Sequence, residues 1–484
     1  MRSPCLALFA GLLVGVVFAD SGAAQTEGPV RVRLFGLSKP AAVSVGGAAT
    51  VSVDGRTLGR IAAGAPVVVA RDGTGVRVSG PGVDGAGQTV EVAPDGGGRL
   101  HVQGGRTQAD VYGRLVVQTV GSELVPVNHV PMAAYVASVV ASEYGFPEIE
   151  GVKAQAVLAR TYAVRARDAR RAYDLDDHQG SQVYRGAGVV TATSERATRE
   201  TTGLLLTYRG VPAEAVYSSS SGGHTADNEA VWLTAAVPYL RGVPDPYDAS
   251  APDHAWRTTA DAARVHAALS RRYGGRVTGV VVHERSREGR AVRVRLIGAR
   301  EAVVSGERFR SVVNGTFGWR TVRSTKFDVS LDGATYAFTG GGFGHGVGMS
   351  QYGARGQARA GRSFLDILGF YFQGTEVSGD AGPAFATAAT RREMPRAPHT
   401  GPTPRGGAVP ASPAAPPAAV PPVAAPPAHA PRGRGEAVVL RNEPEPARPD
   451  ASPTAPAAPA AAPAAAPAAD GRRWPTRRAS RGGW

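Results

Sequence analysis

The hydrophobic pattern of the chain changes at Pro131, and this change limits the fold classes that the sequence can adopt. From Gly28 to about Val130 the apolar residues lie in short segments such as VRVRLF, APVVVA and TVEVAP, which Gly, Asp and Pro separate. Short segments that are rich in Val and partly alternate with polar residues are typical of strands joined by turns. The pattern therefore predicts a small all-β unit before Pro131.

After Pro131 the chain is predicted to form two consecutive helices. The first ends before Gly145 and Pro147, and Pro131 suits its first turn. Its apolar residues recur at the spacing of one helix face, and they are Met132, Tyr135, Val136, Val139 and Val140. The second helix runs from about Ile149 to Ala172, because most of this stretch is free of Gly and Pro and rich in good helix formers. Its stripe of small side chains predicts a closely packed neighbour: Val152, Ala156, Ala159 and Ala163.

The chain beyond Tyr173 mixes both kinds of element. Loops and short strands such as GLLLTYRG are followed by a predicted helix near Asp261 to Tyr273 and by strands in RVTGVVVHERS, AVRVRLIG, TKFDVSL and TYAFTG. A glycine-rich loop then precedes a final helical region that ends near SFLDILGFYFQGTEV. Strands and helices that follow one another in separate runs predict an α+β fold.

The N-terminus is typical of an export signal. Arg2 precedes an apolar run of 14 residues from Leu6 to Ala19, and small residues follow as far as Gln25. We expect residues 1–24 to be a signal peptide and the protein to be exported to the periplasm, cell wall or outside; a retained anchor is the alternative. The single cysteine, Cys5, lies in this segment, so disulfides and a cysteine nucleophile are excluded for the mature chain.

Residues 380–484 are predicted to form a disordered tail. From Asp380 onward lie 23 of the 37 prolines, among Ala-rich repeats with few large apolar side chains. From Ala381 onward the tail also holds half of the net charge of +14, and no block of five like charges occurs in the rest, which disfavours a nucleic-acid partner. We expect the tail either to contact an anionic wall or membrane surface or to act as a passive spacer.

Glu143 is the most informative single residue for chemistry. It follows Val136 by seven positions and Val139 by four, so it lies on the stripe that faces the core. A carboxyl group there is either paired or has a raised pKa, because loss of water disfavours its charged form. A raised pKa suits a general acid, whereas the other interpretation is a boundary Glu bonded to an Arg or to helix amides.

Three other segments carry polar groups without a decisive pattern. The second helix offers Lys153 and its neighbours, which a solvated helix face also explains. The turn from Ser218 to His224 lacks the Gly-x-Ser-x-Gly pattern that would favour a serine hydrolase. The loop from Gly340 to Gly348 fits neither the dinucleotide nor the phosphate-loop pattern, so its His345 is either a donor that faces a ligand or a turn residue.

Three longer segments resemble the SpoIID/LytB family, which is named for the stage II sporulation protein D and the amidase enhancer of bacterial cell walls. They are VPMAAYVASVVASEYGFPEIEGVKAQAVLARTYAV, then VYSSSSGGHTADNEAVW with PYLRGVPDPYD, and GFGHGVGMSQYGARGQARAGRSFLDILGFYFQGT. They occur in the family's order. The resemblance implies a mixed helix and strand domain that acts on peptidoglycan at residues 120–377, preceded by a β-rich region at 28–119.

The resemblance also implies a reaction. In the sporulation branch, the Glu that matches Glu143 is the acid of a lytic transglycosylase, which cleaves the glycan between N-acetylmuramic acid and N-acetylglucosamine without water. Ordinary glycosidases use two carboxylates, and no pattern marks a second one here among the candidates Glu148, Glu150, Asp176 and Asp177. The alternative is a noncatalytic enhancer of an N-acetylmuramoyl-L-alanine amidase, and a weaker third class is a structural protein attached to the wall by its basic tail.

The family match implies a set of substrate-binding residues and no cofactor. The set is Lys153, Gln155, Arg160, Tyr162, Gln182, Tyr184, Ser219, Ser220, His345 and Gln351. Some sporulation members bind zinc through a His and two Cys near the segment that matches DLDDHQGSQVY. Here His178 remains without any Cys, so no metal is expected. The expected partners are glycan strands and, in the enhancer alternative, a cell-wall amidase.

Overall fold

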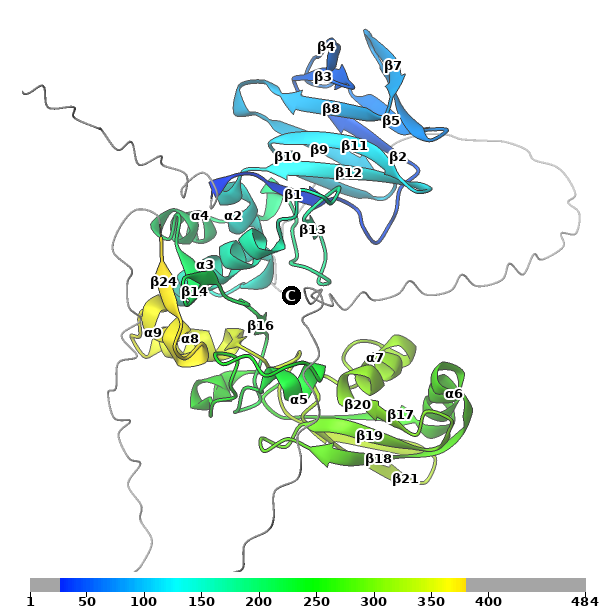
Figure 1. Ribbon diagram of the computed structural model, residues 1–484, viewed down its shortest axis with the longest axis vertical. Coiled ribbons are helices and arrows are strands. Elements are labelled where there is room, and N and C mark those ends of the chain that lie inside the picture. Colours follow the sequence, from blue (N-terminus) through cyan, green and yellow to red (C-terminus); the bar gives the residue numbers. More distant parts are fainter. Residues whose placement is uncertain (1–26, 380–484) are drawn as a thin grey trace, which may run out of the picture. The chain divides into compact units, whose positions relative to one another are not determined.

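The computed structural model describes residues 27–379 (Figure 1). The predicted signal peptide and the predicted tail lie outside these residues. Along the described chain, a run of strands is followed by a run of helices and then by a mixed region. The α+β prediction is therefore confirmed. No helix between residues 27 and 379 is long and apolar enough to cross a membrane.

The N-terminal region is a pair of sheets, antiparallel except for the added strand β13, and the short Val-rich segments predict this β structure. Most strands alternate buried and exposed residues, and their buried valines join one hydrophobic core. The sheets have the orders β13-β1-β12-β11-β8-β3-β4 and β10-β9-β2-β5-β6-β7. The strands are β1 (Val30–Arg33), β2 (Ala42–Gly46), β3 (Ala49–Val53), β4 (Arg56–Ile61), β5 (Val67–Asp72), β6 (Gly75–Gly80), β7 (Val83–Gly87), β8 (Thr89–Pro94), β9 (Arg99–Gly104), β10 (Thr107–Tyr112), β11 (Arg114–Val120), β12 (Glu123–Val130) and β13 (Leu175–Asp176).

Two strand pairings connect this region to the rest of the chain. Strands β11 and β12 form a hairpin in which Val120 pairs with Glu123, so the expected boundary at residue 120 falls within the hairpin. Strand β1 pairs with β12 on one side and, in parallel, with the distant β13 on the other. Arg31 reinforces the second pairing through an ion pair of 2.6 Å with the buried carboxylate of Asp174.

The two predicted helices are present as α2 (Met132–Glu143) and α3 (Ile149–Ala166). Helix α2 begins directly after Pro131 and buries the predicted apolar stripe. Helix α3 ends six residues before the predicted Ala172, which corrects the prediction. The physical reason is a local turn, because Asp168 accepts hydrogen bonds from both the backbone and the side chain of Arg170, and such bonds compete with the helix.

Helix α3 is the centre of the helical part. Its small stripe is buried as predicted, and the helix contacts α2, α4 (Ala192–Glu200), α8 (Gln351–Arg359) and α9 (Phe364–Tyr371). Small side chains allow this many neighbours to approach. Helix α4 was not predicted, although Thr191 and Ser194 form a capping box that marks its start. Strands β14 (Leu205–Tyr208), β15 (Val211–Pro212) and β24 (Glu376–Ser378) form a small sheet beside these helices.

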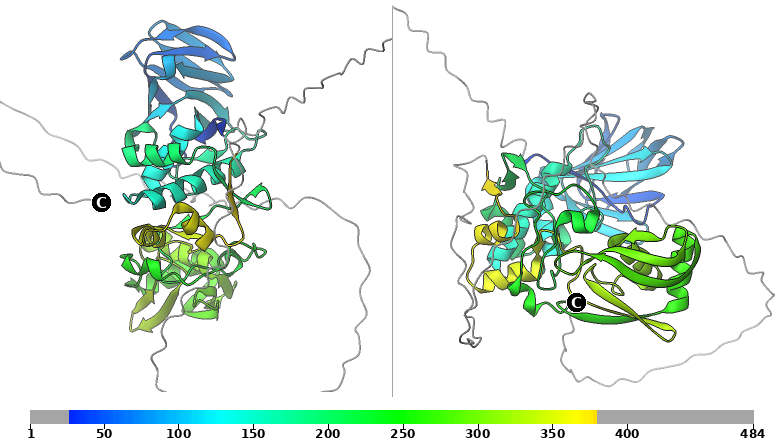
Figure 2. Two further views of the ribbon diagram at one scale, coloured as in Figure 1. Left: turned by 90° about the vertical axis from the view of Figure 1, so that its left-hand side faces the viewer. Right: turned by 60° about the horizontal axis from the view of Figure 1, so that its bottom comes forward.

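Residues 256–340 form a group of strands and helices (Figures 1 and 2) whose side chains make up a second hydrophobic core. The predicted helix and strands are present, and the unpredicted helix α7 begins at the N-cap Ser305. Helix α6 contacts β18 and helix α7 contacts β19. The elements here are β17 (Trp256–Asp261), α6 (Ala262–Tyr273), β18 (Gly275–Arg285), β19 (Ala291–Ala299), β20 (Val303–Ser305), α7 (Gly306–Phe317), β21 (Phe327–Asp332) and β22 (Thr335–Gly340).

The glycine-rich loop returns the chain from this second core to the helices. Gly348 has φ +71°, and a Cβ there would lie 2.2 Å from the backbone oxygen of Val216. That close approach allows β16 (Tyr217–Ser218) to pair in parallel with β23 (Met349–Ser350). The serine-rich turn and the end of the glycine-rich loop, which are far apart in sequence, therefore lie side by side. The remaining short elements are η1 (Asp95–Gly97), η2 (Ala187–Val189), α5 (Asn228–Trp232) and η3 (Pro246–Ser250).

Candidate active site

Glu143 is the last residue of α2, and its carboxyl group is half-buried. Its Oε1 accepts a hydrogen bond of 2.7 Å from the backbone N–H of Val183. Burial raises the pKa of Glu143 above its usual value, while the Val183 N–H and the positive charge of Arg185 partly oppose the rise. No described residue donates a hydrogen bond to Oε2, so this oxygen is free to carry a proton to a bound molecule.

Two tyrosines face Glu143 and are tied together by one amide. Tyr135 donates a hydrogen bond of 2.9 Å to Oε1 of Gln182, and Nε2 of Gln182 donates one of 3.1 Å to the Tyr217 hydroxyl. The charge of Glu143 contributes to the raised pKa of both tyrosines, after burial as the main cause. Both hydroxyls therefore keep their protons and remain hydrogen-bond donors beside the carboxyl group.

Tyr184 and Tyr162 complete the aromatic surroundings. Tyr184 stacks on Tyr135 with ring centroids 5.6 Å apart, and its hydroxyl donates to Asn128 at 2.8 Å. Tyr184 is buried and therefore holds the Tyr135 ring in place through this stacking contact. Tyr162 lies on α3, where burial and the nearby charge of Asp176 raise its pKa.

Gln351 and His345, from the glycine-rich segment, contact Glu143 and Tyr217 respectively. Nε2 of Gln351 donates a hydrogen bond of 2.9 Å to the backbone oxygen of Glu143. His345 is hydrogen-bonded to the backbone of Tyr217, and its Nδ1 accepts from the N–H of Val347 at 3.1 Å. Burial lowers the pKa of His345 to about 4, so the ring is neutral near pH 7. His345 thus positions Tyr217 rather than supplying a positive charge.

Gln155 points at this cluster from α3. Its side chain is fully buried, and its amide lies close enough to the Tyr217 hydroxyl to lower the pKa of that group. Neither amide atom reaches full hydrogen-bond geometry with a described residue. A buried amide without satisfied partners is costly, so Gln155 has unused hydrogen-bonding capacity next to Glu143.

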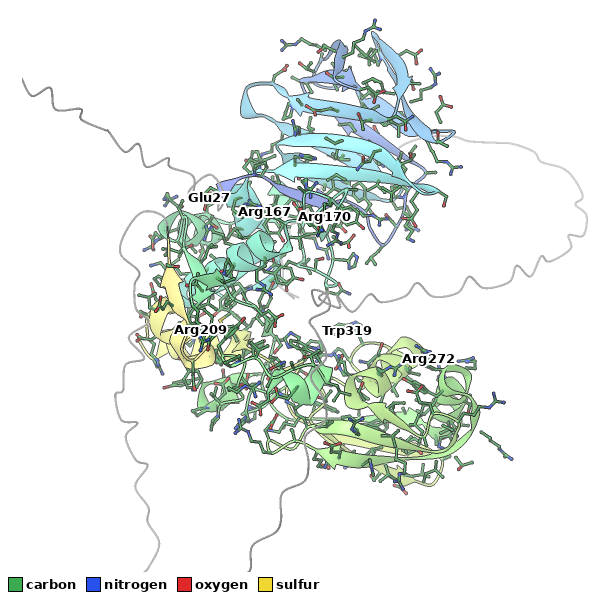
Figure 3. The ribbon with its side chains drawn as sticks, viewed as in Figure 1. Glu27, Arg167, Arg170, Arg209, Arg272 and Trp319 are labelled. Carbon is green, nitrogen blue, oxygen red and sulfur yellow. The ribbon has the colours of Figure 1, made fainter. Side chains whose placement is uncertain are left out.

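The structure does not bring Lys153 and Arg160 into this cluster, although the resemblance implies that they line the cleft. Lys153 forms ion pairs with Glu150 and Glu200, at 2.8 and 2.7 Å, and so joins α3 to α4. Arg160 has no exposed surface and pairs with Glu27, which Figure 3 labels. Both cations are held by structural partners because a charge in the interior needs compensation.

Ser219 and Ser220 lie in the turn that pairs with the glycine-rich loop. The backbone of Ser219 accepts a hydrogen bond of 3.0 Å from the N–H of Tyr352. Ser220 is buried and donates from Oγ to the carboxylate of Asp248 at 2.8 Å, and Nδ1 of His254 bonds that same carboxylate oxygen at 3.1 Å. The serine contacts the acid rather than the imidazole, so this arrangement is not the Ser-His-Asp order of a hydrolase. Ser220 therefore holds the turn in place.

The four candidate second carboxylates have different surroundings. Glu148 is bound by Arg355 and Arg359, and Glu150 accepts from Lys153 and from the backbone of Phe364. The carboxylate of Asp177 accepts from the backbone N–H groups of Phe35 and Gly36. Asp176 alone among the four has no described partner that holds its carboxylate, and it influences Tyr162 rather than Glu143.

The sequence predicts no metal site, because His178 has no neighbouring Cys, and this prediction can be tested. Within residues 27–379 no three His, Cys, Asp or Glu side chains are grouped as metal ligands, and Nδ1 of His178 already accepts from the N–H of Gly180. We expect the glycan cleavage that the resemblance implies to keep its rate, within about twofold, after dialysis against EDTA. Loss of cleavage that zinc restores would show that His178 binds a metal together with other groups.

Sequence reasoning missed several residues of the cluster. Tyr217 lies in the two-residue strand β16 and Arg185 in a loop, both too short for a periodic pattern. Val183 takes part through its backbone, for which sequence gives no signal. Tyr135 could have been found, because it lies on the same face of α2 as Glu143, two turns earlier.

Two family models match parts of the described chain. A family model described as stage II sporulation protein matches residues 120–208, which include Glu143, Gln155 and Gln182. A second model, a domain of unknown function (DUF8618), matches residues 246–348.

Curated relatives cover the same part of the chain. Stage II sporulation protein D of Bacillus subtilis is 34% identical over 271 residues, which are 52% of this chain and 76% of the relative. Its counterpart in Bacillus amyloliquefaciens is 33% identical over 270 residues, 52% of this chain and 75% of the relative. The amidase enhancer of Bacillus subtilis is 28% identical over 277 residues, 48% of this chain and 38% of the relative. The chain therefore belongs to the stage II sporulation protein D family.

Proposed function

We propose that this protein is an exported lytic transglycosylase that cleaves peptidoglycan glycan strands. Membership of the stage II sporulation protein D family and the similarity to an amidase enhancer support a function at the cell wall. The observation that carries the finer proposal is the state of Glu143, a half-buried carboxyl with a raised pKa and one unengaged oxygen. Such a group holds a proton at a pH where an exposed carboxyl has lost it.

In the proposed reaction Glu143 acts first as an acid and then as a base. Its carboxyl gives a proton to the glycosidic oxygen as the bond from that oxygen to C1 of the muramyl sugar breaks. The resulting carboxylate then takes the proton of the muramyl 6-hydroxyl, whose oxygen bonds to C1 and closes a 1,6-anhydro ring. Proton and bonds balance without water, and Glu143 returns to its starting state.

The neighbouring polar groups suit this reaction. We infer that the hydroxyl of Tyr217 binds acetamido or hydroxyl groups of the glycan, while the fully buried amide of Gln155 lies behind it and helps to hold it. Gln351 fixes the backbone at Glu143, so the end of α2 is held from the glycine-rich segment. A second carboxylate is not required, which fits the structural partners of Glu148, Glu150 and Asp177.

The decisive experiment is product analysis of purified glycan strands by mass spectrometry. A lytic transglycosylase yields 1,6-anhydro-muramyl ends, which are lighter by one water than the reducing ends that a hydrolase leaves. Reducing ends that disappear in Asp176→Asn would instead establish a two-carboxylate hydrolase.

The pH dependence of cleavage provides a further prediction. Because Glu143 must be protonated to act as an acid, the rate should fall as pH rises through its pKa, which lies above the usual 4.5. Arg185 favours the carboxylate, so Arg185→Gln should move the falling limb to higher pH. The exposed Arg199→Gln serves as the matched control. An unchanged limb in Arg185→Gln would contradict Glu143 as the titrating acid.

The amidase-enhancer relative supports a second candidate function. In that case the protein binds glycan and stimulates a cell-wall amidase without cleaving strands itself. An amidase assay with added wild-type and Glu143→Gln protein distinguishes the two. Equal stimulation by both proteins, with no anhydro products from either, would favour the enhancer.

A further inference from the structure

Trp319 is the most exposed aromatic side chain in the 256–340 segment, and it is not a loose surface residue. Its relative exposure is 60%, and Figure 3 labels it. Its indole stacks on Phe343 with ring centroids 5.3 Å apart and an interplanar angle of 29°. Phe343 belongs to the glycine-rich loop and exchanges two backbone hydrogen bonds with Ser220. Trp319 is therefore supported by the loop that also carries His345.

The position of Arg320 leaves one face of Trp319 open. The Arg320 guanidinium lies 5.3 Å from the Trp319 ring and 5.5 Å from the Phe343 ring. With 5.3 Å between the two rings, these three points form a nearly equilateral triangle. The cation therefore does not cover the far face of Trp319, since a position over that face would be much farther from Phe343. Phe343 covers one face of the indole, and the other face remains available.

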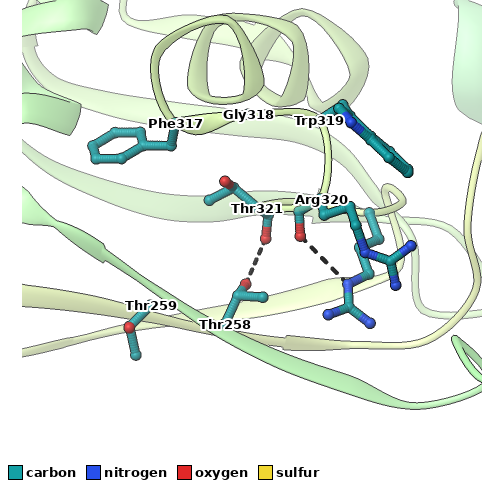
Figure 4. Close-up of a pocket in the computed structure, with 8 residues that line it drawn as sticks. Thr258, Thr259, Phe317, Gly318, Trp319, Arg320 and Thr321 are labelled. Atoms are coloured by element: carbon teal, nitrogen blue, oxygen red, sulfur yellow. Dashed lines mark hydrogen bonds between the residues drawn. The ribbon is translucent and has the colours of Figure 1, made fainter. Parts of the chain in front are cut away.

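This residue borders a pocket of about 430 Å³ between β17 and the segment after α7 (Figure 4). Thr258 and Thr259 lie on the strand opposite Phe317 and Trp319. Thr258 donates to the backbone oxygen of Thr321 at 2.5 Å, which closes the floor. The pocket combines aromatic surface with the hydroxyl group of Thr259, and such a combination suits a ligand that has both apolar faces and polar groups.

The pocket also has an excess of positive charge. Arg320 and Arg323 both contact the same oxygen of Asp253, at 2.9 and 2.5 Å. One carboxylate cannot neutralise two guanidinium groups, and Arg320 remains about half exposed. A free guanidinium face favours a carboxylate, which it can bind with two parallel hydrogen bonds.

We propose that this pocket is a second glycan-binding site, in which Trp319 stacks on a sugar ring and Arg320 binds a carboxylate of the muramyl residue. The inference rests on the proposed glycan substrate and extends it to the 246–348 domain, which has no assigned function. The carboxylate is either the free lactyl group of a strand without stem peptides or an acid of the stem peptide. Both offer the same chemistry to Arg320.

The test measures strand binding in the full chain that also carries Glu143→Gln, so that binding is separated from cleavage. Trp319→Ala should weaken binding of muramyl-containing strands on the order of tenfold, and Trp319→Tyr should retain most of it. Leu331→Ala, which removes an exposed apolar side chain of β21, is the matched control and should bind normally. Because Trp319 is exposed, the thermal unfolding of Trp319→Ala should match that of the control.

Binding of two kinds of strand to the Arg320→Gln variant identifies which carboxylate Arg320 binds. Arg320→Gln should weaken binding of strands with free lactyl groups, of strands with stem peptides, or of both, and should leave an N-acetylglucosamine oligomer unaffected. Unchanged strand binding in Trp319→Ala would overturn the proposed site even if the wild type cleaves glycan. Binding that depends on Trp319 in a protein that cannot cleave glycan would instead overturn the proposed reaction and keep the site.

Discussion

Replacing Glu143 by Gln is expected to abolish glycan cleavage while the fold is retained. Gln keeps the size of the side chain and can still bond near the Val183 backbone, but it has no proton to give and no carboxylate to take one back. Because one group serves both steps, we expect the rate to fall by at least about a thousandfold, toward the upper part of the range for acid–base catalysis. The measurement is the release of anhydro-muramyl products from purified strands.

The matched control is Glu195→Gln, which removes an exposed carboxyl group from the first turn of α4. It should cleave at the wild-type rate and unfold at the same temperature. Release of product by Glu143→Gln at the wild-type rate would exclude Glu143 as the catalytic acid. A lower unfolding temperature of that variant would show that its loss of activity has a structural origin.

Replacing Asp248 by Asn is expected to destabilise the protein strongly. The buried carboxylate of Asp248 accepts hydrogen bonds on both oxygens: Ser221 N and Ser350 Oγ on Oδ1, and Gly222 N, Ser220 Oγ and His254 Nδ1 on Oδ2. Each oxygen therefore faces a backbone N–H. In either orientation of the Asn amide, its NH₂ group faces a backbone N–H, of Ser221 or of Gly222. Two donors then face each other, and the backbone N–H cannot rotate away. We expect a loss of about 3–5 kcal/mol in the free energy of unfolding, typical of a broken buried charged network.

Chemical denaturation measures this loss, and Asp332→Asn is the control. Asp332 is exposed at the end of β21, so its substitution should change the free energy of unfolding by no more than about 0.5 kcal/mol. An equal free energy of unfolding in the two variants would show that the hydrogen bonds of Asp248 do not stabilise the contact between the serine-rich turn and Ser350. Since Gln351 follows Ser350 and bonds to Glu143, a loosened network should also lower the cleavage rate at temperatures where the variant remains folded.

Much of the local structure follows from the sequence because it depends on short-range patterns. Alternating valines fix the faces of the N-terminal strands, and Pro131 and Gly145 bracket α2. Helix α3 was predicted too long, since the bonds of Asp168 to Arg170 end it early and composition does not reveal them. Helix α7 was missed because its signals, the N-cap Ser305 and a following Glu, are short and weak.

The sequence by itself determined the α+β class, the position of Glu143 on a core-facing stripe, and the resemblance to the family that the comparisons confirm. These conclusions need only helix and strand periodicity or matched motifs. Only the tertiary structure decided that Gln182 and Tyr217 lie beside Glu143, whereas Arg160 is an interior cation bound to Glu27. The reason is physical. A residue's partner 35 or more positions away depends on how helices and loops pack. An Arg on a helix can therefore line a cleft or lie in the core, and only its neighbours decide which.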